Sequence, residues 1–187
     1  MMTNVLIKTA RLKSLSQVGR QLTRPFYSWL IEVFNSKDEK RVKEIGADRA
    51  AGEWIIRNGG QVKFASSITL ATNLTSLPFS KSPLIEIHAK DVALTNSGLR
   101  HLEGLEHLEW LDLNGCKHIS DLSPLEEVMD TLKHLDIGNC AGLSDVSPVA
   151  KLTKLQKLVL TGTLGGEKRS GVIETLKKTL PDCEIVD

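Results

Sequence analysis

Residues 108–116, Leu108-Glu-Trp-Leu111-Asp-Leu113-Asn-Gly-Cys116, are the stretch that decides the fold of this 187-residue chain. Their pattern, Leu-x-x-Leu-x-Leu-x-x-Cys, returns over residues 132–140, and it returns over residues 155–163 with threonine in the last place. The central leucines of the three copies lie 24 and then 23 residues apart. A fixed period of this length is typical of a solenoid, in which each repeat adds one strand to a parallel sheet.

Weaker copies flank these three. Ile85-Glu-Ile87 fits the Leu-x-Leu core 26 residues before its counterpart, and Leu180-Pro-Asp-Cys183-Glu-Ile185 fits 25 residues after its counterpart, with Cys183 in a leucine position. The second halves of the repeats also match, since residues 116–125 parallel residues 140–149 as a turn and a short convex segment. We therefore predict an α/β fold, a short leucine-rich-repeat solenoid of about five parallel strands over residues 83–187.

The composition is ordinary for a globular protein, with 41% hydrophobic and 25% charged residues. No apolar run approaches the ~18–20 residues of a membrane span. The formal net charge is +1, but residues 1–25 carry five basic residues and no acid, which leaves 19 basic and 23 acidic residues in the remainder. Three cysteines at repeat-like positions do not suggest a disulfide framework, so a reducing compartment is the simpler interpretation.

Residues 1–25 have the pattern of a mitochondrial presequence. They combine basic residues with serine, threonine and apolar residues near helical spacing, and the first acidic residue of the chain is Glu32. They lack the continuous apolar core of a secretory signal. A basic N-terminal arm is the alternative, and we expect import with cleavage near Arg24.

Residues 26–64 lack the leucine repeat and show helical patterns instead. They predict an N-terminal helical cap over the first apolar layer of the solenoid. Residues 26–34 form an apolar, helix-like stretch. Two further helices are predicted, one capped by Ser36 and one capped by Asp48, and the glycines after Asn58 should end the second. Residues 62–64 are predicted as a strand that starts the sheet, and residues 65–82 as a connector. Packing is the expected role of the large aromatic residues in this block, Trp29, Phe34 and Trp54.

This block resembles the family of coupling factor B, also called ATP synthase subunit s. The resemblance is carried by residues 29–35, by Gly46-x-Asp-Arg-Ala-Ala-x-Glu-Trp54 and by Arg57-x-Gly59, and it continues through Leu77-Pro78 and the repeats to residue 187. It implies a mitochondrial protein associated with ATP synthase and its proton coupling on the matrix side of the inner membrane. A related family is linked to assembly of the complex I membrane arm.

The cysteines are predicted to pack in the core and not to form a redox or metal site. Cys116 and Cys140 occupy equivalent repeat positions and should stack as small buried apolar groups. The family has been discussed as dithiol-sensitive through two cysteines separated by one residue. Here that place reads Asn114-Gly115-Cys116, so the first thiol is missing and the resemblance does not imply a dithiol mechanism for this chain.

Other catalytic and ligand motifs fail in detail. Residues 162–170 follow a strand and precede a helix, but Glu167 and Arg169 flank Lys168 where a phosphate loop needs glycine and serine or threonine. The histidines and cysteines show no zinc spacing. We predict no enzyme and no required cofactor. The resemblance implies one possible Mg²⁺ site at backbone atoms, which would fall at Gly59 and at Ala93, although magnesium prefers carboxylate and water ligands.

The outward residues of the strands predict a binding surface on the concave face, the usual interaction surface of a solenoid. One predicted row is Leu84, Trp110, His134 and Lys157, and the next is Glu86, Asp112, Asp136 and Val159. Carboxylates on strands ~4.8 Å apart repel one another unless a cationic partner relieves them. The predicted contact residues are Glu86, Trp110, Asp112, His134 and Asp136, and an ordinary solvated polar face is the alternative.

The leading prediction is a non-enzymatic factor that binds ATP synthase, peripheral to the membrane and without nucleic-acid contacts. The first alternative is an assembly factor for another inner-membrane complex such as complex I. The second is a substrate-recognition protein of a ubiquitin ligase, against which the acid-free N-terminal segment argues.

Overall fold

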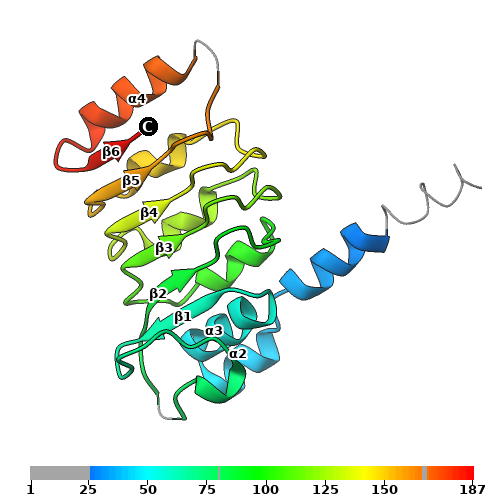
Figure 1. The fold of residues 1–187 in the computed structure, drawn as a ribbon. Coiled ribbons are helices and arrows are strands. Elements are labelled where there is room, and N and C mark those ends of the chain that lie inside the picture. The colour runs from blue at the N-terminus through cyan, green and yellow to red at the C-terminus, as the bar shows by residue number, and fades with distance from the viewer. Residues whose placement is uncertain (1–25, 80, 166–167) are drawn as a thin grey trace, which may run out of the picture.

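The structure, a computed structural model, describes residues 26–79, 81–165 and 168–187 (Figure 1). The predicted presequence, residues 1–25, therefore lies outside the described part of the chain. The described residues form a single stack, with helices at the N-terminal end, a sheet that climbs strand by strand, and a last helix at the far end (Figure 1). No helix among these residues is long and apolar enough to cross a membrane.

The sheet has six strands in the order of the sequence, from β1 to β6. Strand β1 is antiparallel to β2, and each later strand is parallel to the one before it. The strands are β1 (Gln61–Phe64), β2 (Leu84–His88), β3 (Trp110–Asp112), β4 (His134–Asp136), β5 (Lys157–Val159) and β6 (Glu184–Val186). The α/β class and the predicted strand over residues 62–64 are confirmed, and the five parallel strands are β2 to β6.

The leucine pattern explains the stacking of the central strands. Leu111 lies opposite Leu135, and Leu135 lies opposite Leu158, so each repeat adds one buried side chain to the same interior row. The opposite side of each coil is a short 3-10 helix: η2 (Gly98–Leu102), η3 (Ser123–Val128) or η4 (Ser147–Lys151). Proline stands in the first turn of η3 and of η4, where its missing N–H costs no hydrogen bond.

Each strand from β2 to β5 leads into a turn that contains one residue of positive φ. These residues are Asp91, Gly115, Asn139 and Gly162, with φ between 56° and 75°. Glycine adopts this left-handed conformation freely, and aspartate and asparagine tolerate it better than other residues do. The turns follow the same period as the leucines, so backbone and side chains repeat together.

The register corrects the prediction at both ends of the sheet. Ile87 lies opposite Leu111, which is 24 residues away, so the copy at β2 obeys the full period and the predicted spacing of 26 is wrong. Ala89 and Val92, both buried, stand where the central copy has leucine and cysteine. At the other end Ile185 lies opposite Leu158, and Cys183 is half-buried beside the core and not in a leucine position.

The N-terminal cap consists of a helix over residues 26–35, α2 (Glu39–Ile45) and α3 (Ala47–Arg57). Helix α3 buries Ala51, Trp54 and Ile55 in the core, and it ends before Gly59, whose φ of 91° terminates it as predicted. At the far end α4 (Lys168–Thr179) packs Ile173 and Leu176 on the last coil.

Three local predictions for the cap are wrong. Helix α2 is capped by Asp38, whose side chain accepts hydrogen bonds from two backbone N–H groups, and not by Ser36. Helix α3 begins after Gly46, and the carboxylate of Asp48 instead accepts a hydrogen bond from the backbone N–H of Leu84 at 2.8 Å. Of the three aromatic residues expected to pack, only Trp54 is buried.

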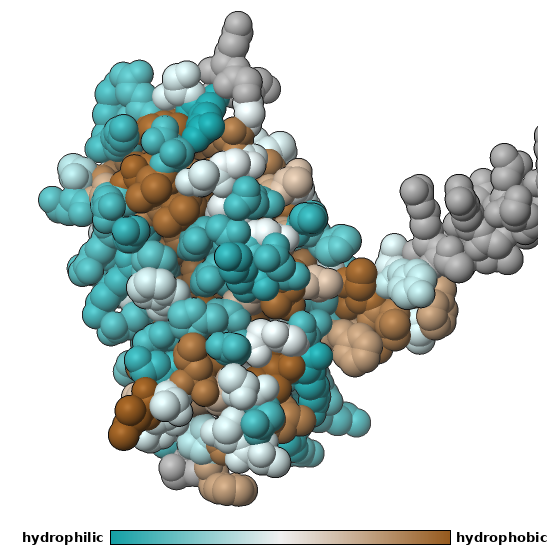
Figure 2. All heavy atoms as spheres, in the orientation of Figure 1, coloured by the Kyte–Doolittle hydropathy of each residue, from teal (hydrophilic) through white to brown (hydrophobic). Residues whose placement is uncertain are grey.

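The other two aromatic residues lie on the helix over residues 26–35, which extends away from the body of the stack (Figure 1). Trp29 is 57% exposed and Phe34 is 52% exposed. This projecting helix carries hydrophobic surface in the space-filling view (Figure 2). The aromatic content of this segment therefore does not indicate burial, because more than half of each ring stays exposed.

Candidate functional site

The candidate site is the polar sheet face, defined as the outward side chains of Glu86, Trp110, Asp112, His134 and Asp136. Strand register sets two rows across it. Glu86 lies opposite Trp110 and begins the first row, whereas His88 lies opposite Asp112 and begins the second. The prediction that Glu86 extends the row of Asp112 and Asp136 is wrong. It assumed a spacing of 26 residues between β2 and β3, whereas the observed spacing of 24 places Glu86 opposite Trp110.

Trp110 forms the centre of this face. Its ring stacks on that of His134, with centroids 3.4 Å apart and planes at 6°, and the ring of His88 lies at 5.9 Å. Trp110 is 37% exposed, although it is part of this stack. Burial lowers the pKa of His134; the charge of Asp136 opposes this shift, and the charge of Lys157 adds to it. The imidazole of His134 is therefore neutral at neutral pH. The stacked rings of Trp110 and His134 therefore form a flat, uncharged aromatic surface within this face.

Glu86 already has an ion-pair partner in Lys63. Its carboxylate accepts hydrogen bonds from Lys63 at 2.7 Å and from His88 at 2.9 Å. Burial alone would raise the pKa of Glu86, but the hydrogen bonds and charges of Lys63 and His88 hold it below its ordinary value. Glu86 thus supports the edge of the stack through these two contacts.

Asp112 and Asp136 are different, because neither has an ion-pair partner among the described residues. They lie opposite one another on β3 and β4. Asp112 accepts a hydrogen bond from the backbone N–H of Asn114 at 2.9 Å, and Asp136 accepts one from the N–H of Gly138 at 2.8 Å. The amide of Asn114 also donates to Asp136 at 3.1 Å. Neutral dipoles hold these two carboxylates in place, and their charges remain uncompensated.

A shallow cavity of about 270 Å³ opens beside the Trp110 and His134 stack. Its wall includes Glu109 and Lys133, which form an ion pair at 2.7 Å, and Gln156. These three residues are not among the contact residues predicted from the sequence. They occupy one repeat position, directly before the outward residue of each strand, so the same period that located Trp110 would have located them.

The cysteines are structural in this arrangement. Cys116 and Cys140 are fully buried, and each thiol donates a hydrogen bond to a backbone carbonyl at 3.1 Å. Burial raises the pKa of Cys116 to about 12 and that of Cys140 to about 11. Both thiols are therefore protonated at physiological pH, and a protonated thiol is a poor nucleophile and metal ligand.

The backbone position implied for magnesium fits the ion poorly. Gly59 and Ala93 are exposed, and the Ala93 carbonyl already accepts a hydrogen bond from the Asn35 amide at 2.9 Å. Mg²⁺ favours carboxylates and water, and the described residues contain no group of three or more His, Cys, Asp or Glu arranged to hold a metal. The magnesium site stays a prediction.

Comparison with known proteins gives a consistent set of relatives. The chain is 32% identical to human and to mouse "ATP synthase subunit s, mitochondrial" and 30% identical to the bovine protein of the same name. Each match extends over 173 residues, which is 87% of this chain and 86% of the relative. No family model matches the chain.

Proposed function

We propose, because this chain belongs to the family of mitochondrial ATP synthase subunit s, that it is a mitochondrial protein that associates with ATP synthase. The names of the relatives support both the compartment and the complex. We place the protein on the matrix side of the inner membrane, as a peripheral factor without catalytic activity that supports proton coupling. Assembly of another respiratory complex is the alternative, and migration on a native gel distinguishes the two.

The proposed fold class is a leucine-rich-repeat solenoid. The strand register supports it, because Ile87, Leu111, Leu135 and Leu158 stack in one interior row at intervals of 24, 24 and 23 residues. The row of positive-φ turns supports it independently. Solenoids of this kind bind partners on an open, continuous surface more often than they enclose a substrate.

The observation that carries the proposal is the exposed Trp110 beside two uncompensated carboxylates. A large, flat aromatic side chain held rigidly by His134 offers contact area at little cost in conformational entropy. Asp112 and Asp136 favour a cation, because like charges on adjacent strands destabilise each other until an opposite charge relieves them. The partner expected on the polar sheet face is therefore a segment of an ATP synthase subunit that bears lysine or arginine beside an apolar residue.

Affinity purification from mitochondria, followed by a native gel, tests this proposal. The bait would be wild-type protein, a variant with Trp110→Ala and Asp112→Asn, and a control with Asp130→Asn, which removes an exposed acid from a turn outside the sheet. Asparagine at 112 can still accept the hydrogen bond from Asn114, so the turn is preserved. We expect wild type and control to migrate with ATP synthase and the double variant to be lost from it.

Two outcomes count against the proposal in different ways. If the wild-type protein migrates with complex I and not with ATP synthase, the partner is wrong. If the folded double variant migrates with ATP synthase as well as wild type does, the polar sheet face is only a solvated surface.

A further inference from the structure

The two edges of the sheet differ in how they are paired. At the N-terminal end, the outer edge of β1 is occupied, because Val62 and Ala71 exchange backbone hydrogen bonds at 3.1 and 2.7 Å. At the other end, β6 is hydrogen-bonded to β5 alone within the residues that the structure describes. The outer edge of β6 is therefore an unpaired strand edge, and such an edge is a template for a further strand.

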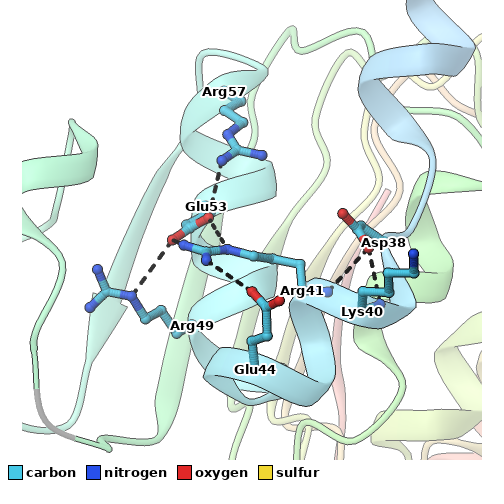
Figure 3. A network of polar contacts seen from close by, with 7 residues as sticks. All are labelled: Asp38, Lys40, Arg41, Glu44, Arg49, Glu53 and Arg57. Atoms are coloured by element: carbon cyan, nitrogen blue, oxygen red, sulfur yellow. Dashed lines mark hydrogen bonds and ion pairs between the residues drawn. The ribbon is translucent and has the colours of Figure 1, made fainter.

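The cap also encloses the first layer of the core. Helices α2 and α3 are joined by the buried carboxylate of Glu53, which binds Arg41 at 2.8 Å and contacts two arginines of its own helix (Figure 3). The ring of Trp54 on α3 stacks on that of His101 on η2, with centroids 4.6 Å apart. The N-terminal end of the stack is thus closed by helices that are held to each other and to the first coil.

The last layer of the core is covered less completely. Ile185 continues the interior row of Leu135 and Leu158, which are fully buried, but its own side chain is only half-buried. Helix α4 lies against η4, on the side of the coil opposite the sheet. Each earlier strand has the next coil beside its interior residue, and the described residues provide no such coil for β6.

Strand β6 lacks the features that usually protect an edge. It contains no proline or lysine, and its register with β5 has no bulge. Its length of three residues equals that of β3, β4 and β5, so shortness is common to these strands and not a protection of the edge. Glu184 carries a charge, but it forms an ion pair with Lys157 on the neighbouring strand at 3.3 Å.

The hydrogen-bonding groups at the open edge belong to Ile185. The N–H of Glu184 donates to the carbonyl of Gln156 at 2.8 Å. The carbonyl of Val186 accepts from the N–H of Leu160 at 2.7 Å. Because both of these residues face β5, the N–H and C=O of Ile185 between them point to the open side. Two residues directly opposite each other in an antiparallel pair exchange both N–H···O bonds, so Ile185 of a second copy supplies the matching donor and acceptor.

Charge and hydrogen bonding favour one register for such a pair. Antiparallel pairing centred on Ile185 sets Glu184 opposite Val186 of the second copy, so no acid directly faces an acid. Pairing centred on Asp187 would set two carboxylates opposite each other, which destabilises a strand pair. Pairing centred on Cys183 would need an N–H that is already bonded within its own chain at 3.1 Å. The register centred on Ile185 also places its half-buried side chain beside an identical one.

We propose that β6 pairs with β6 of a second copy, antiparallel and centred on Ile185, so that two chains form a twofold dimer with one continuous sheet. Each copy contributes the same edge, as in other isologous dimers. The twofold axis runs perpendicular to the sheet, so both polar sheet faces lie on the same side of it. A partner with two binding segments then engages both copies at a high effective concentration. The dimer does not depend on the proposed function.

Sedimentation equilibrium of the full chain, from micromolar to millimolar concentration, tests the dimer. Proline at position 185 removes only the N–H at the open edge, because Glu184 and Val186 make the bonds to β5. Ile185→Pro should therefore weaken dimerisation at least about tenfold, since both central hydrogen bonds are lost. Ile185→Val keeps the N–H and most of the side chain, and this control should dimerise like the wild type. Circular dichroism confirms that both variants are folded.

Cysteine substitutions test the register. Positions 184 and 186 of opposite copies face each other with Cα atoms about 4.5 Å apart, within the range of a disulfide. Two copies of the same position lie on a diagonal, about 7–8 Å apart. In a Cys183→Ser background, a mixture of the Glu184→Cys and Val186→Cys proteins should therefore form a disulfide-linked dimer in air more completely than either protein alone. This experiment also decides the question if Ile185→Pro fails to fold.

Three results would overturn the proposal: a wild-type chain that stays monomeric over the whole range, a folded Ile185→Pro variant that dimerises as tightly as wild type, or a cysteine mixture that links no better than its components. Hydrogen exchange distinguishes the other occupant of the edge. If the Ile185 amide of a monomeric chain becomes protected only when purified ATP synthase is added, the edge binds a strand of a partner and not a second copy.

Discussion

The indole of Trp110 lies flat on the imidazole of His134, with ring centroids 3.4 Å apart. This contact contributes to the burial that keeps His134 neutral. Trp110→Ala should therefore raise the pKa of His134 toward its ordinary value, because the ring regains water that stabilises its charged form. Titration of the histidine ring protons by nuclear magnetic resonance measures this. An unchanged pKa would mean that the shift has a source other than the stack.

The charge of Asp112 should affect partner binding through its dependence on salt. Asp112→Lys is expected to weaken association and to flatten its salt dependence, because opposite charges act mainly on encounter and register. Trp110→Ala should weaken association by loss of contact area and leave the salt dependence largely intact. Pull-downs at low and moderate salt measure both, with circular dichroism to confirm folding. Asp130→Lys is the control, and an equal loss of binding in that variant would refute a specific role for Asp112.

The buried thiols should matter for stability alone. Cys116→Ala and Cys140→Ala each remove a well-packed sulfur and its hydrogen bond to a carbonyl, and we expect a loss of about 1 kcal/mol in the free energy of unfolding. Cys183→Ala, at a half-buried position, should change it by less than about 0.5 kcal/mol. Thermal unfolding of the three variants measures these losses of stability. A variant that keeps its melting temperature and loses the partner would contradict this view.

His101 predicts how stability depends on pH. Its pKa is about 4 in the folded protein and near 6.5 when unfolded, so the unfolded chain binds the proton first. The stability associated with the neutral ring is present above pH 6.5 and is lost as the pH falls toward 4, by about 3 kcal/mol in total. His101→Phe keeps an aromatic ring on Trp54 and should flatten the stability curve in this window. Urea unfolding at several pH values would show it, and an unaltered curve would assign the acid sensitivity to other groups.

The N-terminal segment should direct import. Residues 1–25 contain five basic residues and no acid, and a fluorescent reporter fused after residue 30 is expected to enter mitochondria. A second reporter in which the five basic residues are replaced by glutamine should stay in the cytosol. Cytosolic retention of the first reporter and of the full chain would refute the proposed compartment.

The sequence predicted the parallel sheet because leucines at a fixed period have a single packing solution in a stack of coils. It failed at β2 for a physical reason. Ala89 and Val92 are buried like their larger counterparts, but neither has the leucine or cysteine identity by which the other copies are recognised. The acidic row inherited that error, so two of the three predicted carboxylates lie side by side and the third, Glu86, does not.

The cap was less predictable. The contact of Trp54 with His101 spans two elements that share no repeat. Aromatic content predicted burial for Trp29 and Phe34, yet both are exposed. Burial depends on what lies opposite a side chain, and a periodic pattern provides that information whereas the irregular sequence of the cap does not.

The turns with positive φ alternate between a residue with a side chain and a glycine, and this alternation limits how the chain can change length. A side chain added at Gly115 would collide with the carboxylate of Asp91, and one added at Gly162 would collide with the amide of Asn139. Two residues with side chains therefore do not fit next to each other in this row of turns. Deleting one coil, residues 92–115, would place the Asn139 side chain over that of Asp91. Deleting two, residues 92–139, would set Gly162 next to Asp91 and restore the alternation. Deleting the single coil of residues 116–139 would set Gly162 next to Gly115, where neither residue has a side chain. Loss of residues 92–115 should therefore be tolerated less well than loss of residues 116–139 or of both coils.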